Sequence, residues 1–392
     1  MLLHQEWLEP TLSRHLHIGR LEYIHYAGAR MLRHVCSIAL LWLAVTAAAA
    51  EVQPQPVASL KNIRILATGG TIAGAGEGSS ASYRAGVVPI GNILTTVPGL
   101  AEIAHISAEQ VANVGSYDID EAIWLRLLSR VQAALADPEI SGVVITHGTD
   151  TLEETAYFLS LATSSVKPIV LVGSMRPSTA TSADGPQNLM DAVRVASSDE
   201  ARNRGALVVM NDTIFDAATV SKLDVRRVNA FGAPSRGPIG EVLTDRPRFF
   251  GDADADAHDA AFPVVSKTLP RVAIAYAYAG IQGDDIRAAA ADAKGIVIAG
   301  VGAGGFSASA REAVKGFTSK GIPVVRTARQ GAGDIWVNPP SMGDLSDEAS
   351  QTVAGRELSP AKARILLMLA LQTPRSRAEL QTLFDLYGSG RR

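Results

Sequence analysis

Residues 63–74 read IRILATGGTIAG, an apolar run that ends in a glycine turn beside hydroxyl side chains. A run of this kind suits a strand that is buried on both faces of a parallel sheet. The Gly69-Gly70 pair allows a tight turn and leaves backbone N–H groups unobstructed next to the Thr71 hydroxyl, which suits an oxyanion hole. A threonine after a glycine turn is common, however, so this stretch alone favours a structural loop.

Similar apolar runs alternate with helical patterns along the rest of the chain. Between the runs, apolar residues at 123, 127, 131 and 135 recur every four residues, the spacing of one helix face. The alternation predicts an α/β fold: a larger N-terminal domain with a mainly parallel sheet flanked by helices, and a smaller C-terminal α/β domain. The runs lie at 142–146, 168–173 and 206–210, then at 272–277, 295–299 and 323–327, before a helix at 360–372.

The N-terminal region has the pattern of a secretory signal. Arg33 and His34 precede an apolar run and three alanines that end before Glu51, and this run is shorter than the ~20 residues of a spanning helix. We therefore expect a periplasmic or secreted protein with no membrane association after the signal is removed. The expected order is an extension before the true start (1–30), signal peptide (31–50), linker (51–60), N-terminal domain (61–243), interdomain linker (244–268) and C-terminal domain (269–392).

Composition excludes several kinds of chemistry. With 19% charged residues and a net charge of −3, nothing indicates nucleic-acid binding, so the expected partner is a small molecule. The one cysteine, Cys36, and five of the eight histidines lie in the N-terminal region that we expect to be removed, which disfavours a thiol nucleophile, a zinc cluster or a histidine triad. The aspartates at 252–256 lack the glycine and glutamate of a calcium loop, so neither metal nor cofactor is expected.

Hydroxyl side chains follow four of the predicted strands. Ligands bind beyond the carboxyl ends of parallel strands, so we expect the loops with Thr71, Ser116, Thr149 and Ser174 to converge on one site. Asp150 lies beside Thr149, just before a sequence, TLEE at 151–154, that fits a capping box. Asp150 is therefore either a capping acid or a carboxylate that binds a substrate ammonium group.

Two other features suggest chemistry and are better explained by structure. His147 directly follows a buried strand and has no acidic partner at a recognisable spacing, so we predict a structural histidine rather than a catalytic base. Residues 300–305 fit G-x-G-x-x-G, but the next strand ends on Arg326 and not on an acid, which disfavours dinucleotide binding.

Two segments together resemble a known enzyme family. ILATGGTIAG at 65–74 and VITHGTDTLEETA at 144–156 are similar to the signatures of the bacterial type II L-asparaginases of the asparaginase/glutaminase family. The resemblance implies hydrolysis of the side-chain amide of L-asparagine to L-aspartate and ammonia by a threonine nucleophile, without a cofactor. It covers roughly residues 61–387 and continues through 173–177, 182–186, 208–212 and 360–364.

The resemblance also implies residue roles. Thr71 would attack the amide, with Tyr83 beside it on a mobile flap, and Thr149, Asp150 and Lys222 would form a second hydroxyl, carboxylate and amine set. A lysine relays protons only if its surroundings tune its pKa toward neutrality. Which threonine acts at which step stays open. The resemblance places Ser116 and Asp150 at the substrate's α-carboxylate and α-ammonium and Ser174 near the scissile amide; the substrate-binding set is Gly70, Ser116, Tyr117, Thr149, Asp150 and Ser174.

The sequence departs from the family pattern at the α-amino end of the substrate. Tyr117 stands where many relatives have a glutamine, Ala279-Gly280 where they often have an asparagine, and Asp344 near an expected glutamate. The family works as a homotetramer in which the neighbouring chain completes each site, and we expect the same here.

Three alternatives to a strict asparaginase follow. L-Glutamine stays open as a second substrate, because one methylene is worth only ~1 to 3 kcal/mol in a pocket. A non-catalytic amino-acid-binding homologue is a further alternative. The amidase subunit that supplies ammonia for transfer-RNA amidation is disfavoured, because it predicts an extra N-terminal domain in place of the export signal.

Overall fold

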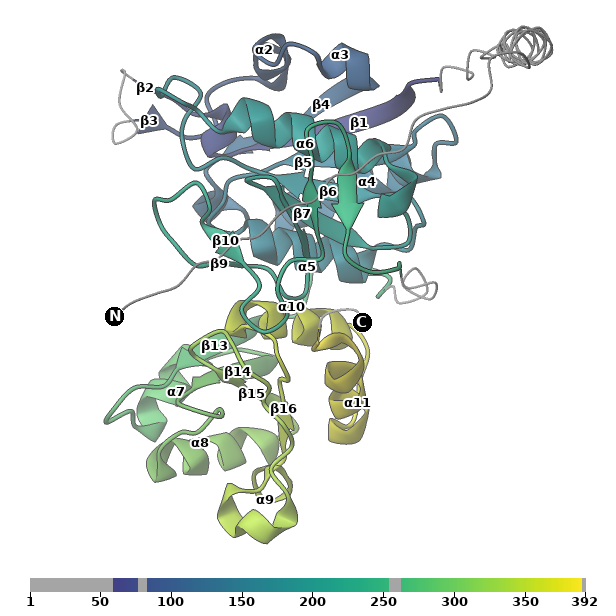
Figure 1. The fold of residues 1–392 in the computed structure, drawn as a ribbon. Helices are drawn as coiled ribbons and strands as arrows, with labels where there is room; N and C mark the ends of the chain where they lie inside the picture. Colours follow the sequence, from purple (N-terminus) through teal and green to yellow (C-terminus); the bar gives the residue numbers. More distant parts are fainter. Residues whose placement is uncertain (1–58, 77–82, 254–261, 390–392) are drawn as a thin grey trace, which may run out of the picture. The chain divides into compact units, whose positions relative to one another are not determined.

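The computed structural model of the chain describes residues 59–76, 83–253 and 262–389. The predicted signal peptide, the extension before it and most of the predicted linker (51–60) lie outside these residues, as does the stretch at 254–261. From Leu60 onward the chain forms one compact unit that contains a larger and a smaller sheet (Figure 1).

The larger sheet has eight strands in the order β12-β11-β8-β7-β6-β5-β1-β4. The strands from β4 to β7 pair in parallel, and β8, β11 and β12 continue the sheet in antiparallel pairing. The prediction of a mainly parallel sheet is therefore confirmed. The bounds are β1 (Lys61–Gly69), β4 (Ala104–Val114), β5 (Gly142–Thr146), β6 (Ile169–Val172), β7 (Ala206–Met210), β8 (Thr213–Asp216), β11 (Gly240–Val242) and β12 (Pro247–Phe249).

Helices cover both faces of this sheet. On one face lie α4 (Glu121–Ala136) and α5 (Leu152–Ala162), and the predicted four-residue repeat is confirmed because Ile123, Leu127 and Val131 are buried. Asp120 starts α4 by accepting a bond from the Ile123 N–H at 2.8 Å. The other face is covered by α2 (Ile90–Thr95), α3 (Leu100–Ile103) and α6 (Gly185–Ser197).

The smaller sheet is parallel throughout, in the order β13-β14-β15-β16. Three of its four strands match the C-terminal apolar runs, so the predicted second α/β domain is confirmed. Its bounds are β13 (Val272–Tyr276), β14 (Gly295–Gly300), β15 (Val324–Ala328) and β16 (Thr352–Ala354), with α7 (Gly283–Ala289), α8 (Ala308–Thr318), α9 (Asp347–Ser350), α10 (Pro360–Ala370) and α11 (Arg377–Tyr387).

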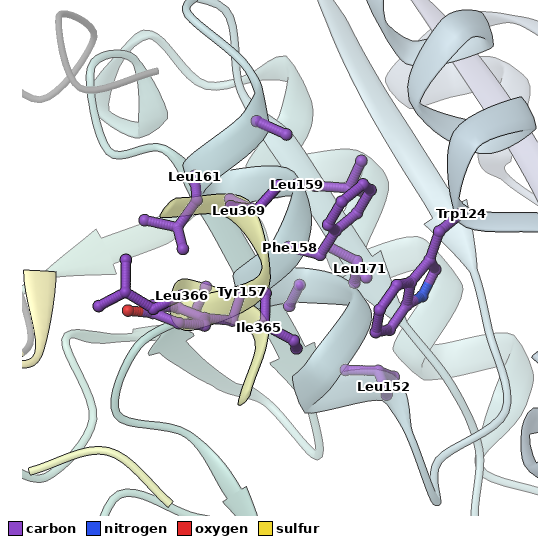
Figure 2. Packing of buried hydrophobic residues seen from close by; sticks show 14 of the residues in the cluster. Trp124, Leu152, Tyr157, Phe158, Leu159, Leu161, Leu171, Ile365, Leu366 and Leu369 are labelled. Atoms are coloured by element: carbon purple, nitrogen blue, oxygen red, sulfur yellow. The ribbon is translucent and has the colours of Figure 1, made fainter. Parts of the chain in front are cut away.

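One hydrophobic core joins the two sheets. Phe158 and Leu159 of α5 belong to the same buried cluster as Leu366 of α10 and as Val297 and Val325 of the smaller sheet. Figure 2 shows side chains of the two helices packed together, with Trp124 stacked on Phe158 at a centroid distance of 5.0 Å. Helix α10 is apolar on nearly every side because it packs against α5 and the smaller sheet at once.

Three local features differ from the sequence expectations or extend them. Strand β12 lies inside the stretch expected to be a linker, where Arg248 pairs with Glu241 of β11. Strands β7 and β8 form a hairpin through Asn211 and Asp212, which both have positive φ, as a two-residue turn of this type requires. Two short ribbons complete the fold: β2 (Ala75–Gly76) with β3 (Tyr83–Arg84), and β9 (Ser221–Lys222) with β10 (Phe231–Gly232).

Within the described ranges, no helix has the length and hydropathy needed to cross a membrane.

Candidate active site

The loops predicted to converge lie at the carboxyl edge of the larger sheet. Because β4, β1, β5 and β6 are parallel neighbours, their carboxyl ends meet along one edge. The loops that follow them carry Ser116, Thr71, Thr149 and Ser174, in that order along the edge. The four hydroxyl-bearing loops thus follow neighbouring strand ends along one edge, as expected, and their forming one site stays a prediction.

Two glycines bring the loops of Thr71 and Thr149 into backbone contact. Gly70 has φ 80° and ψ −170°, a conformation essentially restricted to glycine, and a Cβ there would lie 2.2 Å from the Cα of Gly148. Thr71 and Thr149 are the residues that follow these two glycines. The Gly70 N–H donates to the Val114 carbonyl at 2.8 Å, so the expectation that this N–H is free for an oxyanion hole is wrong.

Thr71 is paired with Tyr83. Their hydroxyl oxygens lie 2.8 Å apart, and Thr71 is almost fully buried while Tyr83 is 38% exposed. Tyr83 reaches Thr71 from the β2–β3 ribbon, across Gly74. A Cβ at Gly74 would lie 2.8 Å from the Tyr83 ring, so the motif's last glycine leaves room for that ring.

Thr149 belongs to a second polar set. The Lys222 ammonium donates to the Thr149 hydroxyl at 2.8 Å and to the Asp150 carboxylate at 2.6 Å. Ser116 joins the set because its hydroxyl accepts from the Asp150 N–H at 3.2 Å. The Asp150 side chain is 59% exposed while that of Lys222 is 14% exposed, so the carboxylate faces solvent and the ammonium lies behind it. The structure therefore brings together Thr149, Asp150, Lys222 and Ser116.

Lys222 enters the site from the short strand β9. Its backbone N–H donates to the Glu153 carboxylate at 2.6 Å, and Lys222 pairs with Phe231 of β10. Sequence reasoning did not identify Glu153 as part of this arrangement. Its only signal was its position three residues after Asp150, on the first turn of a predicted helix.

The expected capping box is not formed. Thr151 is the N-cap of α5, but its hydroxyl donates to the Ser116 carbonyl at 2.8 Å and not to the helix. Glu153 binds Lys222, and Glu154 lies 4.0 Å from Arg364 of α10. These acids serve contacts with other elements because the helix begins at the edge of the site. Asp150, bound to Lys222, is likewise not a capping acid.

His147 is structural, as predicted. It is fully buried, and burial lowers its pKa to about 4, so the ring is neutral at neutral pH. Nδ1 lies 2.7 Å from the Gly148 carbonyl, which can only accept, so Nδ1 carries the proton. Nε2 therefore accepts from Thr155, whose hydroxyl in turn accepts from the Trp124 indole N–H at 2.9 Å. This network holds Gly148 in place beneath the site.

The other residues singled out in the sequence make different contacts. Ser174 is buried and its hydroxyl donates to the Arg176 carbonyl at 2.8 Å, so its role toward a substrate amide stays a prediction. Tyr117 is 73% exposed, and its ring lies over Gly115. Gly280 has φ 90° after β13, and Asp344 lies 3.7 Å from Lys315.

Two features of the smaller sheet concern the dinucleotide and metal alternatives. The G-x-G-x-x-G stretch after β14 folds back on itself through a bridge between Val301 and Gly305, and Arg326 donates to the Ala303 carbonyl at 3.1 Å. Arg326 also forms a buried ion pair with Asp347 at 2.6 Å. Within residues 59–76, 83–253 and 262–389, no group of three or more His, Cys, Asp or Glu side chains could hold a metal.

Comparison with known proteins identifies both halves of the chain. The family described as Asparaginase, N-terminal matches residues 62–254, and the Glutaminase/Asparaginase C-terminal domain matches residues 271–384. Both matches contain the sheets described above, and together they include every site residue named here.

Individual relatives cover most of the chain. L-asparaginase 2 of Bacillus subtilis (strain 168) is 44% identical, over 84% of this chain and 87% of the relative. The glutaminase-asparaginase of Pseudomonas fluorescens biotype A is 41% identical, over 89% and 96%. A crystal structure of a probable cytoplasmic L-asparaginase from Campylobacter jejuni superposes with a TM-score of 0.78 at 40% identity, over 83% and 100% of the two chains. This chain therefore belongs to the asparaginase/glutaminase family.

Proposed function

We propose that this enzyme hydrolyses the side-chain amide of L-asparagine to L-aspartate and ammonia, with Thr71 as the nucleophile. The observation that carries the proposal is the adjacency of two hydroxyl sets, Thr71 with Tyr83 and Thr149 with Lys222 and Asp150, across the Gly70–Gly148 contact. A hydroxyl beside a proton acceptor is the usual arrangement of an activated nucleophile.

The proposed reaction has two halves. In the first, the Thr71 oxygen attacks the amide carbon while its proton passes to the Tyr83 oxygen and on to the amide nitrogen, which leaves as ammonia. In the second, water attacks the resulting ester, and Thr71 regains its proton as aspartate leaves. The Lys222 ammonium polarises the Thr149 hydroxyl, and this second set orients the water.

The substrate's α-groups are proposed to bind at the exposed part of the site. The Asp150 carboxylate, facing solvent beside the Ser116 hydroxyl, fits an α-ammonium, and Ser116 fits the α-carboxylate. Tyr117, where the family pattern has a glutamine, would supply another polar group toward the substrate's α-groups. A relative named glutaminase-asparaginase at 41% identity supports glutamine as a second substrate.

Replacement of the proposed nucleophile tests this function. Thr71→Ala removes the attacking oxygen, and we expect kcat for asparagine to fall by about 10³-fold or more, while Thr71→Ser keeps measurable turnover. Ammonia release is measured for L-asparagine, L-glutamine and D-asparagine in parallel. Full asparagine turnover by Thr71→Ala, or no ammonia from any substrate with the parent protein, would contradict the proposal.

We further propose a homotetramer in which the neighbouring chain completes each site. Apolar and aromatic side chains at the carboxyl edge of the smaller sheet support this, because Tyr276, Tyr278 and Trp336 are all about half exposed in the single chain. Light scattering of the purified protein measures the assembly directly. A monomer with full activity would rule out a site shared between chains.

Export to the periplasm or the medium is proposed from the sequence of residues 31–50. The charged start, apolar run and alanine-rich end support cleavage before Glu51. N-terminal sequencing of protein recovered from the periplasm or medium should begin at or close to Glu51. Retention of the full chain in the cytoplasm would contradict it.

A further inference from the structure

Lys362 is a buried lysine that the reaction proposed above does not use. It lies in the first turn of α10, which begins at the N-cap Ser359, and its side chain is 1% exposed. Burial lowers the pKa of its ammonium, and the fields of Glu153, Asp216 and Glu154 oppose this effect. A desolvated ammonium needs bonding partners, so what it binds is informative.

Its partners are two carbonyls in the segment that leads to Lys222. The Lys362 ammonium donates to the Ala218 carbonyl at 3.1 Å and also to the Val220 carbonyl. Residues 217–220 connect β8 to β9, and Lys222 comes two residues after the second carbonyl. The ammonium therefore ties the approach to Lys222 to a helix of the C-terminal domain.

The same segment is bonded from its other end. The Asp216 carboxylate accepts from the Ala218 N–H at 2.8 Å, and the Asp216 carbonyl accepts from the Val220 N–H at 3.0 Å. Beyond it, Glu153 of α5 accepts from the Lys222 N–H at 2.6 Å. Lys362 thus adds hydrogen bonds to the backbone segment just before Lys222, which Asp216 and Glu153 also bind.

The position of Lys222 is sensitive to these hydrogen bonds. Its ammonium lies 2.8 Å from the Thr149 hydroxyl and 2.6 Å from Asp150. Because hydrogen bonds weaken as these distances lengthen, a small shift of Lys222 would weaken both bonds. A displacement of about 1 Å far from the reacting atoms can cost roughly 10²-fold in rate. Loss of the bonds at Val220 and Ala218 would release the backbone to make such a shift.

We propose that Lys362 is a positioning residue for the reaction, which holds the Lys222 ammonium against Thr149 by binding the backbone carbonyls that precede it. This inference rests on the proposed role of Lys222. It assigns a part of the active-site geometry to the C-terminal domain of the same chain. A lysine that only stabilised the domain contact would change the unfolding temperature but not the kcat of folded molecules.

Two substitutions separate these roles. Lys362→Met removes the charge and all donors at nearly the same volume, and we expect kcat per folded molecule to fall about 10- to 100-fold with KM within about twofold. Lys362→Arg keeps a cationic donor and should fall only about 3- to 10-fold. The matched control is Lys167→Met, because the Lys167 ammonium also donates to a backbone carbonyl, that of Asp137 at 2.6 Å, before the start of β6. We expect its kcat to stay within about twofold of the parent.

A double-mutant comparison tests whether the effect passes through Lys222. In a Lys222→Met background, the further loss from Lys362→Met or Lys362→Arg should be less than about twofold, because the group being positioned is gone. Equal losses in both backgrounds, or unchanged kcat in the folded single variants, overturn the proposal. If Lys362→Met does not fold, Lys362→Arg carries the same comparison. Full activity of Lys222→Met alone would instead contradict the proposed function.

Discussion

The Cα of Gly148 lies where a side chain on Gly70 would have to be, at 2.2 Å from the ideal Cβ position. The contact is between main chains, so no neighbouring side chain can rotate away to make room. This backbone contact between Gly70 and Gly148 sets the distance between the loop of Thr71 and the loop of Thr149.

Gly70→Ala should therefore lower activity strongly. The new methyl group would require both the glycine-restricted conformation and a separation of the two loops, and we expect kcat to fall by at least about 10²-fold. Gly237→Ala is the control, because Gly237 has φ 76° with open space around its Cβ position and tests the conformational cost alone. Steady-state kinetics on both variants measure the difference; equal activity of the two would show that the contact is unimportant.

Tyr83→Phe should lower kcat and leave KM nearly unchanged. The ring over Gly74 is kept, while the hydroxyl 2.8 Å from Thr71 is lost, and a positioned proton-transfer group contributes about 10²- to 10⁴-fold. Tyr157→Phe is the matched control, since it removes a buried hydroxyl that donates to the Tyr387 carbonyl. It should lower the Tm only. A Tyr83→Phe enzyme with parental kcat would remove Tyr83 from the mechanism.

Tyr117→Gln should improve substrate binding. The substitution introduces the flexible amide that the family resemblance implies at the substrate's α-groups, so we expect KM for asparagine to fall a few-fold, by about 1 kcal/mol of binding, with kcat unchanged. Initial-rate kinetics with asparagine and glutamine measure this change. An increase in KM for both substrates would show that the tyrosine itself binds substrate.

The buried His147 predicts a loss of stability as the pH falls. Its folded-state pKa of about 4 lies below the unfolded value of about 6.5, so the unfolded chain binds the proton first. The contribution of neutral His147 is complete above pH 6.5 and is lost as pH falls to 4, by up to about 3 kcal/mol. Urea unfolding between pH 7 and 4 should show a shallower pH dependence for His147→Gln than for the parent. Identical slopes would contradict a neutral buried imidazole.

Asp347→Ala should destabilise the C-terminal domain. Asp347 is fully buried, pairs with the Arg326 guanidinium through two bonds of 2.6 Å, and accepts from the Asn338 N–H. Removing one partner of a buried pair costs about 3–5 kcal/mol because the other charge is left uncompensated. The exposed pair of Arg287 with Asp284 provides the control, where Asp284→Ala should cost less than about 1 kcal/mol. Thermal unfolding measures both changes, and comparable costs would contradict the argument.

Much of the fold follows from local pattern. Strands buried on both faces have nearly continuous apolar sequences, so the runs at 142–146 and 206–210 could be located to within a residue. The antiparallel edge was not predicted, because β8, β11 and β12 are short. Their strongest local signal was Asn211-Asp212, a pair that tolerates positive φ in a hairpin turn.

The candidate site likewise contains residues that local sequence pattern predicts and residues that it does not. Thr71, Ser116 and Thr149 could be brought together from the rule for parallel strand ends, which needs only their positions after strands. Lys222 came from family resemblance alone, since it lies on a two-residue strand with no periodic signal. The failure of the capping box has a physical reason: Thr151 and Glu154 match the local motif, but Thr151 binds the Ser116 carbonyl and Glu154 lies near Arg364, contacts between residues distant in sequence that no local pattern encodes.

The shared core of α5 and α10 determines when the chain can fold during synthesis. Helix α5 is synthesised well before α10, which carries part of the apolar surface that covers it. The nascent chain can therefore bury this surface only after the ribosome has synthesised α10. Until then the leucines of α5 stay exposed, and exposed apolar surface makes an incomplete chain prone to aggregation.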